Sequence, residues 1–281
     1  MSLSQKYVLI TGCSANGLGA ALVDVFLQHD YHIFATLRTP SKAPSHFSTL
    51  SNITILALDV VSPTDIASAV DAVKKKTGGR LDVLVNNSGR FEVMPALDTS
   101  IKEGKKLFDL NLWAPLAMIQ AFAPLLIEAR GCVVNVSSVA AVLPLYFQSI
   151  YSASKAALMN ASEIWRLELA LLGVRTLTIM TGSVRSNVFE TMSGGKVPET
   201  SYYAAVAKDI YDLGDGRLAE YAISSDAWAK TVVDAVEKGT TGKVWFGGAA
   251  SATGWAAWLL PAWMVDKSMT SFMPWVKKIQ R

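Results

Sequence analysis

Residues 7–28 read YVLITGCSANGLGAALVDVFLQ, and this stretch decides the fold. It begins with a short apolar run of β-forming residues, Tyr7 to Thr11, and ends with a helical run, Ala20 to Gln28. Between the two runs the chain has three glycines, at Gly12, Gly17 and Gly19. Glycines let backbone N–H groups approach a phosphate closely, and a helix N-terminus attracts an anion. The order strand, glycine turn, helix therefore predicts a dinucleotide-binding α/β fold; the alternative is that the glycines only form a tight turn.

The rest of the chain repeats this alternation of apolar strands and helices. Further strands are expected at His32 to Leu37, Ile53 to Leu58, Leu81 to Val85, Cys132 to Val136, Val174 to Met180 and Lys243 to Phe246. Helices are expected at Ser62 to Lys76, Ile101 to Arg130, from Ser149 onward, and at Ser225 to Lys238. The pattern predicts one α/β domain over residues 1–247, a Rossmann-type doubly wound parallel sheet of about seven strands.

Composition and charge narrow the class of protein. Hydrophobic residues make up 51% of the 281, which is enough for a full-sized core. The 26 basic and 23 acidic residues are scattered, so the concentrated basic patch of a nucleic-acid-binding protein is missing. Cys13 and Cys132 fit no metal spacing and no disulfide framework. The first strand starts near residue 7, before a targeting segment could fit. We expect a cytoplasmic protein with reduced thiols, no metal and no nucleic-acid partner.

The groups suited to proton transfer lie in residues 135–155, NVSSVAAVLPLYFQSIYSASK. Tyr151 and Lys155 are one helical turn apart and share a face of the expected helix. A phenol titrates near pH ~10, and a neighbouring ammonium should lower that pKa toward the working range. Ser138 ends the preceding strand, where its hydroxyl could donate to the carbonyl oxygen that Tyr151 protonates. The set predicts carbonyl reduction or its reverse; the alternative is a surface tyrosine and lysine.

Together with the glycine motif, Ser138, Tyr151 and Lys155 resemble the serine and Y-x-x-x-K signature of short-chain dehydrogenases/reductases. The resemblance implies that Tyr151 donates the proton, Ser138 polarises the carbonyl, and Lys155 binds the nicotinamide ribose. It also implies that Asn111 holds a water that links Lys155 to solvent. A mid-helix asparagine is otherwise disfavoured, although Asn111 could instead mark a kink ahead of Pro115.

The same resemblance implies a cofactor and its contacts. At the second strand end, Leu37 stands where NAD-binding folds place an acidic residue, and Arg38 next to it can pair with a 2′-phosphate. The expected cofactor is therefore NADPH, with Arg38 as its selector, although Arg38 could also be only a solvated arginine. The full set implied for the cofactor is Gly12, Ser14, Asn16, Gly17, Leu18, Gly19, Arg38, Asp59, Val60, Asn87, Ser88, Gly89, Tyr151, Lys155, Gly182, Val184 and Ser186.

Two departures from the family pattern suggest a subgroup. TGCSANGLG has one residue more between Gly12 and Gly17 than the usual T-G-x-x-x-G-x-G, so Asn16 stands in place of a glycine. Asparagine tolerates a left-handed backbone better than most residues. Thr181 replaces the proline usual in P-G-x-V-x-T. Both departures resemble fungal NADPH-dependent 1-acyldihydroxyacetone-phosphate reductases.

The last third of the chain carries a possible lid and an unusual tail. Residues 187–216 show no strong period and are expected to form a lid over the substrate. Residues 248–281 form a Trp-rich extension, and its apolar run from Trp255 to Val265 is short of the roughly 20 residues that a bilayer span needs. Tryptophans near lysines suit a membrane interface. The alternatives are a cover over the chain's own apolar pocket or an oligomer contact.

The sequence thus predicts an NADPH-dependent ketone reductase with a hydrophobic, lipid-like substrate. The alternative enzyme is a tailoring ketoreductase or alcohol dehydrogenase acting on a polyketide or terpenoid. A phosphate-bearing substrate would need a basic group near the lid, which Arg185 or Lys196 could supply. A cofactor-sensing or scaffold protein without turnover is a third hypothesis, against which the intact catalytic set argues. The resemblance also implies a homo-oligomer, paired through the helices around 101–130 and 149–173.

Overall fold

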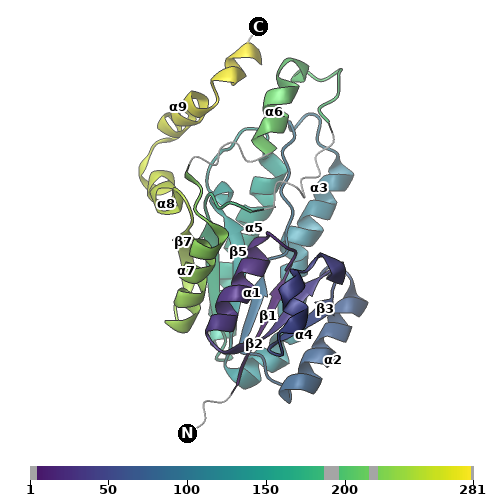
Figure 1. The fold of residues 1–281 in the computed structure, drawn as a ribbon. Helices are drawn as coiled ribbons and strands as arrows, with labels where there is room; N and C mark the ends of the chain where they lie inside the picture. The colour runs from purple at the N-terminus through teal and green to yellow at the C-terminus, as the bar shows by residue number, and fades with distance from the viewer. Residues whose placement is uncertain (1–4, 187–195, 215–220, 280–281) are drawn as a thin grey trace.

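The computed structural model describes residues 5–186, 196–214 and 221–279. Its centre is one parallel sheet with the strand order β3-β2-β1-β4-β5-β6-β7 (Figure 1). The strands are β1 (Lys6–Thr11), β2 (Tyr31–Leu37), β3 (Ile53–Ala57), β4 (Val83–Asn86), β5 (Cys132–Ser138), β6 (Arg175–Thr181) and β7 (Gly242–Phe246). The predicted doubly wound α/β fold with seven parallel strands is confirmed.

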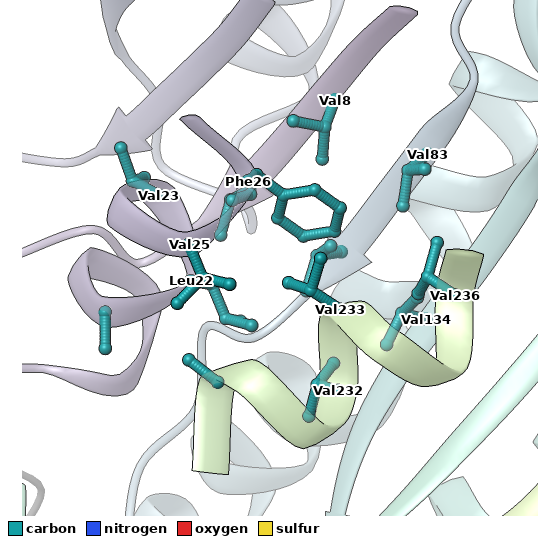
Figure 2. Packing of buried hydrophobic residues seen from close by; sticks show 14 of the residues in the cluster. Val8, Leu22, Val23, Val25, Phe26, Val83, Val134, Val232, Val233 and Val236 are labelled. Atoms are coloured by element: carbon teal, nitrogen blue, oxygen red, sulfur yellow. The ribbon is translucent and has the colours of Figure 1, made fainter. Parts of the chain in front are cut away.

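The central strands are mostly apolar because helices cover both faces of the sheet. All residues of β2 are buried, as are those of β4. On one face, α1 (Leu18–Gln28) packs against α7 (Ser225–Glu237), and Phe26 fills the space between these helices and the strands (Figure 2). On the other face lie α2 (Pro63–Thr77), α4 (Ala114–Ala129) and α5 (Ser149–Ala170). The fold is a three-layer sandwich.

The one long helix expected over residues 101–130 is interrupted. It consists of α3 (Ile101–Phe108), a π-helical turn η3 (Asp109–Trp113), and α4. Asn111 is buried within this π-turn. Such turns are rare and occur frequently at functional sites. The expected kink near Pro115 is therefore a π-turn that carries the asparagine.

The stretch Ile101–Ala129 is long and apolar enough to cross a membrane by length and composition alone. In the fold, 44% of its apolar window is buried inside the protein, and α4 contributes to the core beneath the sheet. The same composition test is passed by core helices of proteins that do not span a membrane. Its burial accounts for the apolar sequence.

The Trp-rich tail forms α8 (Ala250–Leu259), α9 (Ala262–Phe272) and a short 3₁₀ segment η8 (Pro274–Ile279). Trp255, Trp258 and Trp263 are exposed by 65%, 77% and 65%. In contrast, Met273 is buried and Trp275 packs into a third hydrophobic cluster. The two parts of the tail therefore differ: the helices present tryptophans to solvent, and the terminal segment packs inward.

Candidate active site

A cavity of about 1450 Å³ lies along the carboxyl ends of the strands. In open α/β sheets this edge is where ligands bind, next to the point where strand order reverses, here between β1 and β4. Most of the predicted site residues line it: Gly12, Ser14, Gly17, Leu18, Arg38, Asp59, Val60, Asn87, Ser88, Gly89, Ser138, Tyr151, Lys155, Gly182, Val184 and Ser186. Asn16, Gly19 and Asn111 do not line it.

The turn after β1 depends on the absence of side chains. Gly12 has φ +76°, and its N–H donates to the Thr36 carbonyl at 2.9 Å. A Cβ on Gly19 would lie only 2.4 Å from the Gly12 carbonyl oxygen, so Gly19 lets α1 approach the turn. Asn16 has φ +62°, which agrees with the left-handed backbone expected for it. Gly19 and Asn16 thus shape the turn from behind the cavity wall.

The Asn87 segment braces the sheet beneath this turn. The Thr11 hydroxyl accepts hydrogen bonds from the backbone N–H groups of Asn87 and Ser88, at 3.0 and 2.9 Å. The Asn87 amide nitrogen in turn donates to the Thr11 carbonyl at 2.8 Å. These bonds join the end of β1 to the end of β4, so both strand ends are held at the cavity wall.

The wall beyond β2 carries positive charge. Leu37 is buried, and the exposed Arg38 follows it at the cavity edge. Lys42, in the short 3₁₀ turn η1 (Pro40–Lys42), lines the same cavity and was missed in the sequence. Its carbonyl accepts from the Ala15 N–H at 2.9 Å, which ties η1 to the glycine turn. A glycine turn too tight for a Cβ, with Arg38 and Lys42 beside it, fits the phosphates of a dinucleotide cofactor.

Ser138, Tyr151 and Lys155 meet on the opposite wall. Ser138 is the last residue of β5, and Tyr151 and Lys155 come from the first turns of α5. The Tyr151 ring packs edge-on against Phe91, with ring centroids 4.9 Å apart. The Lys155 Nζ donates to the Val136 carbonyl at 2.8 Å. The hydroxyl, phenol and ammonium predicted to act together therefore line one cavity.

The pKa of Tyr151 differs from the prediction that Lys155 lowers it. Burial raises the pKa of Tyr151, and a hydrogen bond with the Ser138 side chain acts in the lowering direction. Burial is the larger of these two causes, and the Lys155 Nζ donates to the Val136 carbonyl. The prediction that Lys155 lowers the Tyr151 pKa is thus wrong for this arrangement. A phenol with a raised pKa stays protonated at neutral pH, which is the form that can donate a proton.

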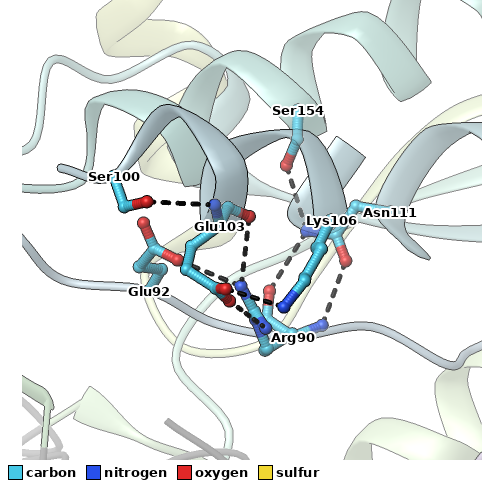
Figure 3. A network of polar contacts seen from close by, with 7 residues as sticks. All are labelled: Arg90, Glu92, Ser100, Glu103, Lys106, Asn111 and Ser154. Carbon is cyan, nitrogen blue, oxygen red and sulfur yellow. Dashed lines mark hydrogen bonds and ion pairs between the residues drawn. The ribbon is translucent and has the colours of Figure 1, made fainter. Parts of the chain in front are cut away.

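Asn111 is a structural link between the cavity wall and α5. Its Oδ1 accepts from the Arg90 N–H at 3.0 Å, and its Nδ2 donates to the Arg90 carbonyl and to the Ser154 Oγ (Figure 3). Ser154 precedes Lys155 and donates to the Tyr151 carbonyl at 2.7 Å. The amide thus holds Arg90 in place relative to α5. A proton relay through Asn111 stays a prediction.

An ion-pair network supports the Arg90 side of this link. Arg90 Nη2 lies 3.2 Å from the nearly buried Glu92 carboxylate and also donates to the Glu103 carbonyl of α3 (Figure 3). Burial raises the pKa of Glu92, and the Arg90 guanidinium opposes that rise. Phe91, which lies between Arg90 and Glu92 in the chain, packs edge-on against the Tyr151 ring.

Backbone packing shapes the wall at the end of β6. Gly182 N–H donates to the Phe246 carbonyl, and a Cβ on Gly182 would lie 2.3 Å from the Gly248 carbonyl oxygen. Val184 is buried and forms a bridge with Ile223. Side chains larger than hydrogen are therefore excluded at Gly182, where the family pattern also has glycine.

The cavity's tyrosine end, defined here by Phe91, Leu145, Gln148, Tyr151 and Leu213, is mainly apolar. Apart from Tyr151, these residues were missed because no motif marks them. Leu213 belongs to α6 (Ala207–Gly214), inside the predicted lid; residues 187–195 and 215–216 of that lid lie outside the described residues. Arg185 and Lys196, considered for a substrate phosphate, are exposed and do not line the cavity.

Lys155 should make cofactor binding depend on pH. Burial lowers its pKa to about 8, so the ammonium is present below that pH and lost above it. If Lys155 holds the cofactor, NADPH affinity should fall as pH rises through 8. Fluorescence titration on both sides of pH 8 measures this. Lys155→Met should bind weakly without that pH step; a wild-type affinity that is flat across the range would contradict the role.

Comparisons with known proteins agree with this geometry. A family model described as short chain dehydrogenase matches residues 6–196. The short-chain dehydrogenase ptmH of Penicillium ochrochloron is 41% identical over 94% of this chain and 96% of its own length. The NADPH-dependent 1-acyldihydroxyacetone phosphate reductase of Schizosaccharomyces pombe is 37% identical over 74% of this chain and 71% of its own length.

A solved structure of a short-chain dehydrogenase has a similar fold. A short-chain dehydrogenase from Streptomyces avermitilis superposes with a TM-score of 0.79 at 27% identity, covering 99% of this chain and 98% of that one. The resemblance to the family, and to the fungal reductase within it, is confirmed. The chain belongs to the short-chain dehydrogenase family of oxidoreductases.

Proposed function

We propose that this oxidoreductase uses NADPH to reduce a ketone on an apolar substrate. The observation that carries the proposal is that Ser138, Tyr151 and Lys155 line one cavity whose other end has Arg38 and Lys42. When bound, the nicotinamide supplies a hydride to the carbonyl carbon. The carbonyl oxygen takes the phenolic proton of Tyr151, which leaves an alcohol.

The side chains divide the remaining work. The Ser138 hydroxyl donates to the carbonyl oxygen and holds it within reach of Tyr151. The Lys155 ammonium binds the ribose and restores the tyrosine's proton after the transfer. Asn111 is a positioning residue, because its amide reaches the catalytic helix only through Ser154 and the cavity wall through Arg90. Proton donation by a positioned group contributes about 10² to 10⁴ in rate.

The choice of NADPH over NADH is supported by charge. A 2′-phosphate needs a cation that can form charge-assisted hydrogen bonds, and the guanidinium of Arg38 suits it. Lys42 adds a second cation at the same wall. An acidic residue, which would favour the ribose hydroxyls of NADH, is absent here: Leu37 is buried and apolar. The name of the fission-yeast relative points the same way.

The substrate is proposed to be uncharged at the tyrosine end. The wall there is formed by apolar side chains and the Gln148 amide, and the nearby Arg90 is already paired with Glu92. The fission-yeast relative favours an acyl-dihydroxyacetone phosphate as the alternative. Arg185 and Lys196 do not line the cavity, whereas Arg90 and Lys106 do, and these two are paired with Glu92 and Glu103. The described residues therefore favour a neutral ketone.

A panel of carbonyl compounds tests the proposal. Purified protein is titrated with NADPH, and nicotinamide absorbance is then followed with neutral cyclic and long-chain ketones and with an acyl-dihydroxyacetone phosphate. The matching alcohols with NADP⁺ cover the reverse direction. We expect turnover of neutral apolar ketones. NADPH binding without turnover of any carbonyl or alcohol would contradict an enzymatic role.

The exposed tryptophans of α8 and α9 are proposed to contact a membrane surface. Aromatic side chains of this kind gather at the interface between lipid and water. Replacing Trp255, Trp258 and Trp263 by serine should weaken binding to phosphatidylcholine–phosphatidylserine vesicles by roughly tenfold or more. Sedimentation with vesicles measures it. Replacing Tyr202 and Tyr211, which are also exposed, is the control; equal losses in both variants, or no binding by wild type, would contradict the proposal.

A further inference from the structure

The C-terminal segment Pro274–Ile279 packs beside the tyrosine end of the cavity. A hydrophobic cluster there joins Phe91 and Tyr151 of the cavity wall to Leu213 of α6. Trp275, Val276 and Ile279 pack against this same cluster, and the segment lies against the 3₁₀ turn η6 (Ala204–Val206). Residues from the far end of the chain thus support the wall around the proposed proton donor.

The segment and the preceding helix α9 contact two neighbouring residues of the loop before α5, Tyr146 and Phe147. The Trp275 ring stacks on Phe147, with centroids 5.8 Å apart and planes 18° apart. The Tyr146 hydroxyl shares a hydrogen bond with the Thr270 hydroxyl at 3.1 Å. Tyr203 contacts the same Phe147 ring edge-on at 5.5 Å. Phe147 is therefore enclosed by aromatic rings from two different parts of the chain.

Phe147 is a residue whose backbone needs such support. Its φ is +63°, a left-handed conformation that a bulky side chain rarely adopts and that persists only where surroundings hold it. The Phe147 carbonyl accepts a hydrogen bond from the Met94 N–H at 2.7 Å, which holds the backbone of Phe147 as well. The nearby residues Leu145 and Gln148 line the cavity, and Gln148 is the N-cap of α5. The stack on Trp275 therefore bears on the shape of the cavity wall.

Tyr203, Thr270 and Trp275 lie outside the part of the chain that the family model matches, which ends at residue 196. The cofactor turn and the catalytic set lie inside it. Building on the proposed function, we propose that Trp275 is a positioning residue that, through Phe147, shapes the tyrosine end for bulky apolar carbonyl compounds. Trp275 affects the choice of substrate and leaves the affinity for the cofactor unchanged.

Two substitutions and a matched control test this role. Trp275→Ala removes the stack, Trp275→Phe keeps an aromatic ring in its place, and Trp258→Ala removes a tryptophan that is 77% exposed and outside the cluster. We expect Trp275→Ala to raise KM for the bulkiest ketone by about tenfold, the scale of a lost apolar contact in a pocket. KM for a small ketone and the Kd for NADPH should change little, and Trp275→Phe should recover most of the loss.

A purely structural role would give a different pattern. It would lower Tm and reduce turnover of all ketones in the same proportion, and that result would overturn the proposal. Hydrogen exchange of the backbone amides at residues 145–148 gives a second readout that needs no substrate. Faster exchange in Trp275→Ala than in Trp258→Ala supports the coupling, and equal exchange overturns it. If wild type reduces no carbonyl compound, the proposed function fails while the exchange result still decides the coupling.

Discussion

Replacing Tyr151 by phenylalanine is expected to lower kcat by about two to four orders of magnitude, the usual contribution of a positioned proton donor. The substitution removes only the hydroxyl, so the edge-on packing against Phe91 stays. NADPH affinity should hardly change, because the ribose contact is assigned to Lys155. Steady-state kinetics with the best ketone of the panel and an NADPH titration measure the two effects separately.

Tyr203→Phe is the matched control for this experiment. Tyr203 packs in the same hydrophobic cluster but does not line the cavity, so loss of its hydroxyl should leave kcat within a factor of about two. A Tyr151→Phe enzyme that keeps near wild-type turnover would remove the basis for the mechanism. Equal loss in both variants would mean that the cluster, and not the proton donor, sets the rate.

Replacing Arg38 by aspartate is expected to reverse the cofactor preference. The change removes charge-assisted hydrogen bonds, worth about 1.5 to 3 kcal/mol, and adds a carboxylate that repels the 2′-phosphate. The ratio of kcat/KM for NADPH over NADH should therefore fall by roughly 10² or more. The carboxylate can also accept from the ribose hydroxyls of NADH, so activity with NADH should hold or rise.

Two other cations provide the comparison for Arg38. Arg185→Met removes an exposed arginine that is outside the cavity and should leave the ratio unchanged. Lys42→Met removes the second cation of the same wall and should give a smaller fall than the Arg38 variant. An Arg38→Asp enzyme that still prefers NADPH would assign the selection to other residues.

The strand and helix pattern of the sheet could be predicted because it is local. Apolar runs such as Tyr7 to Thr11 are buried on both faces, and glycine turns mark where they end. The π-turn at Asp109–Trp113 could not be predicted, because the flanking residues continue an ordinary helical pattern. What selects the turn is the non-local set of bonds from Asn111 to Arg90 and Ser154.

The site shows the same division. Motif residues such as Ser138 and Arg38 were found because their position relative to a strand end is written in the sequence. Lys42 was missed because it reaches the cavity only through the folding back of η1. The pKa of Tyr151 was predicted in the wrong direction because helical spacing does not show that the phenol is buried, and burial raises its pKa. The composition of the tail suited a membrane, a pocket cover and an oligomer contact equally. Only the packing shows that Trp258 is exposed and that Trp275 packs against a hydrophobic cluster.

The crowding around Gly19 and Gly182 has a consequence for redesigning this enzyme. A single added methyl group at either position would lie within 2.4 Å of a carbonyl oxygen, so mutant libraries directed there would mostly return misfolded protein. Phe91, Leu145 and Leu213, by contrast, line the tyrosine end with side chains whose size sets the room for a substrate. Directed evolution toward new ketones can therefore concentrate on those three codons and leave the half that holds the nucleotide untouched.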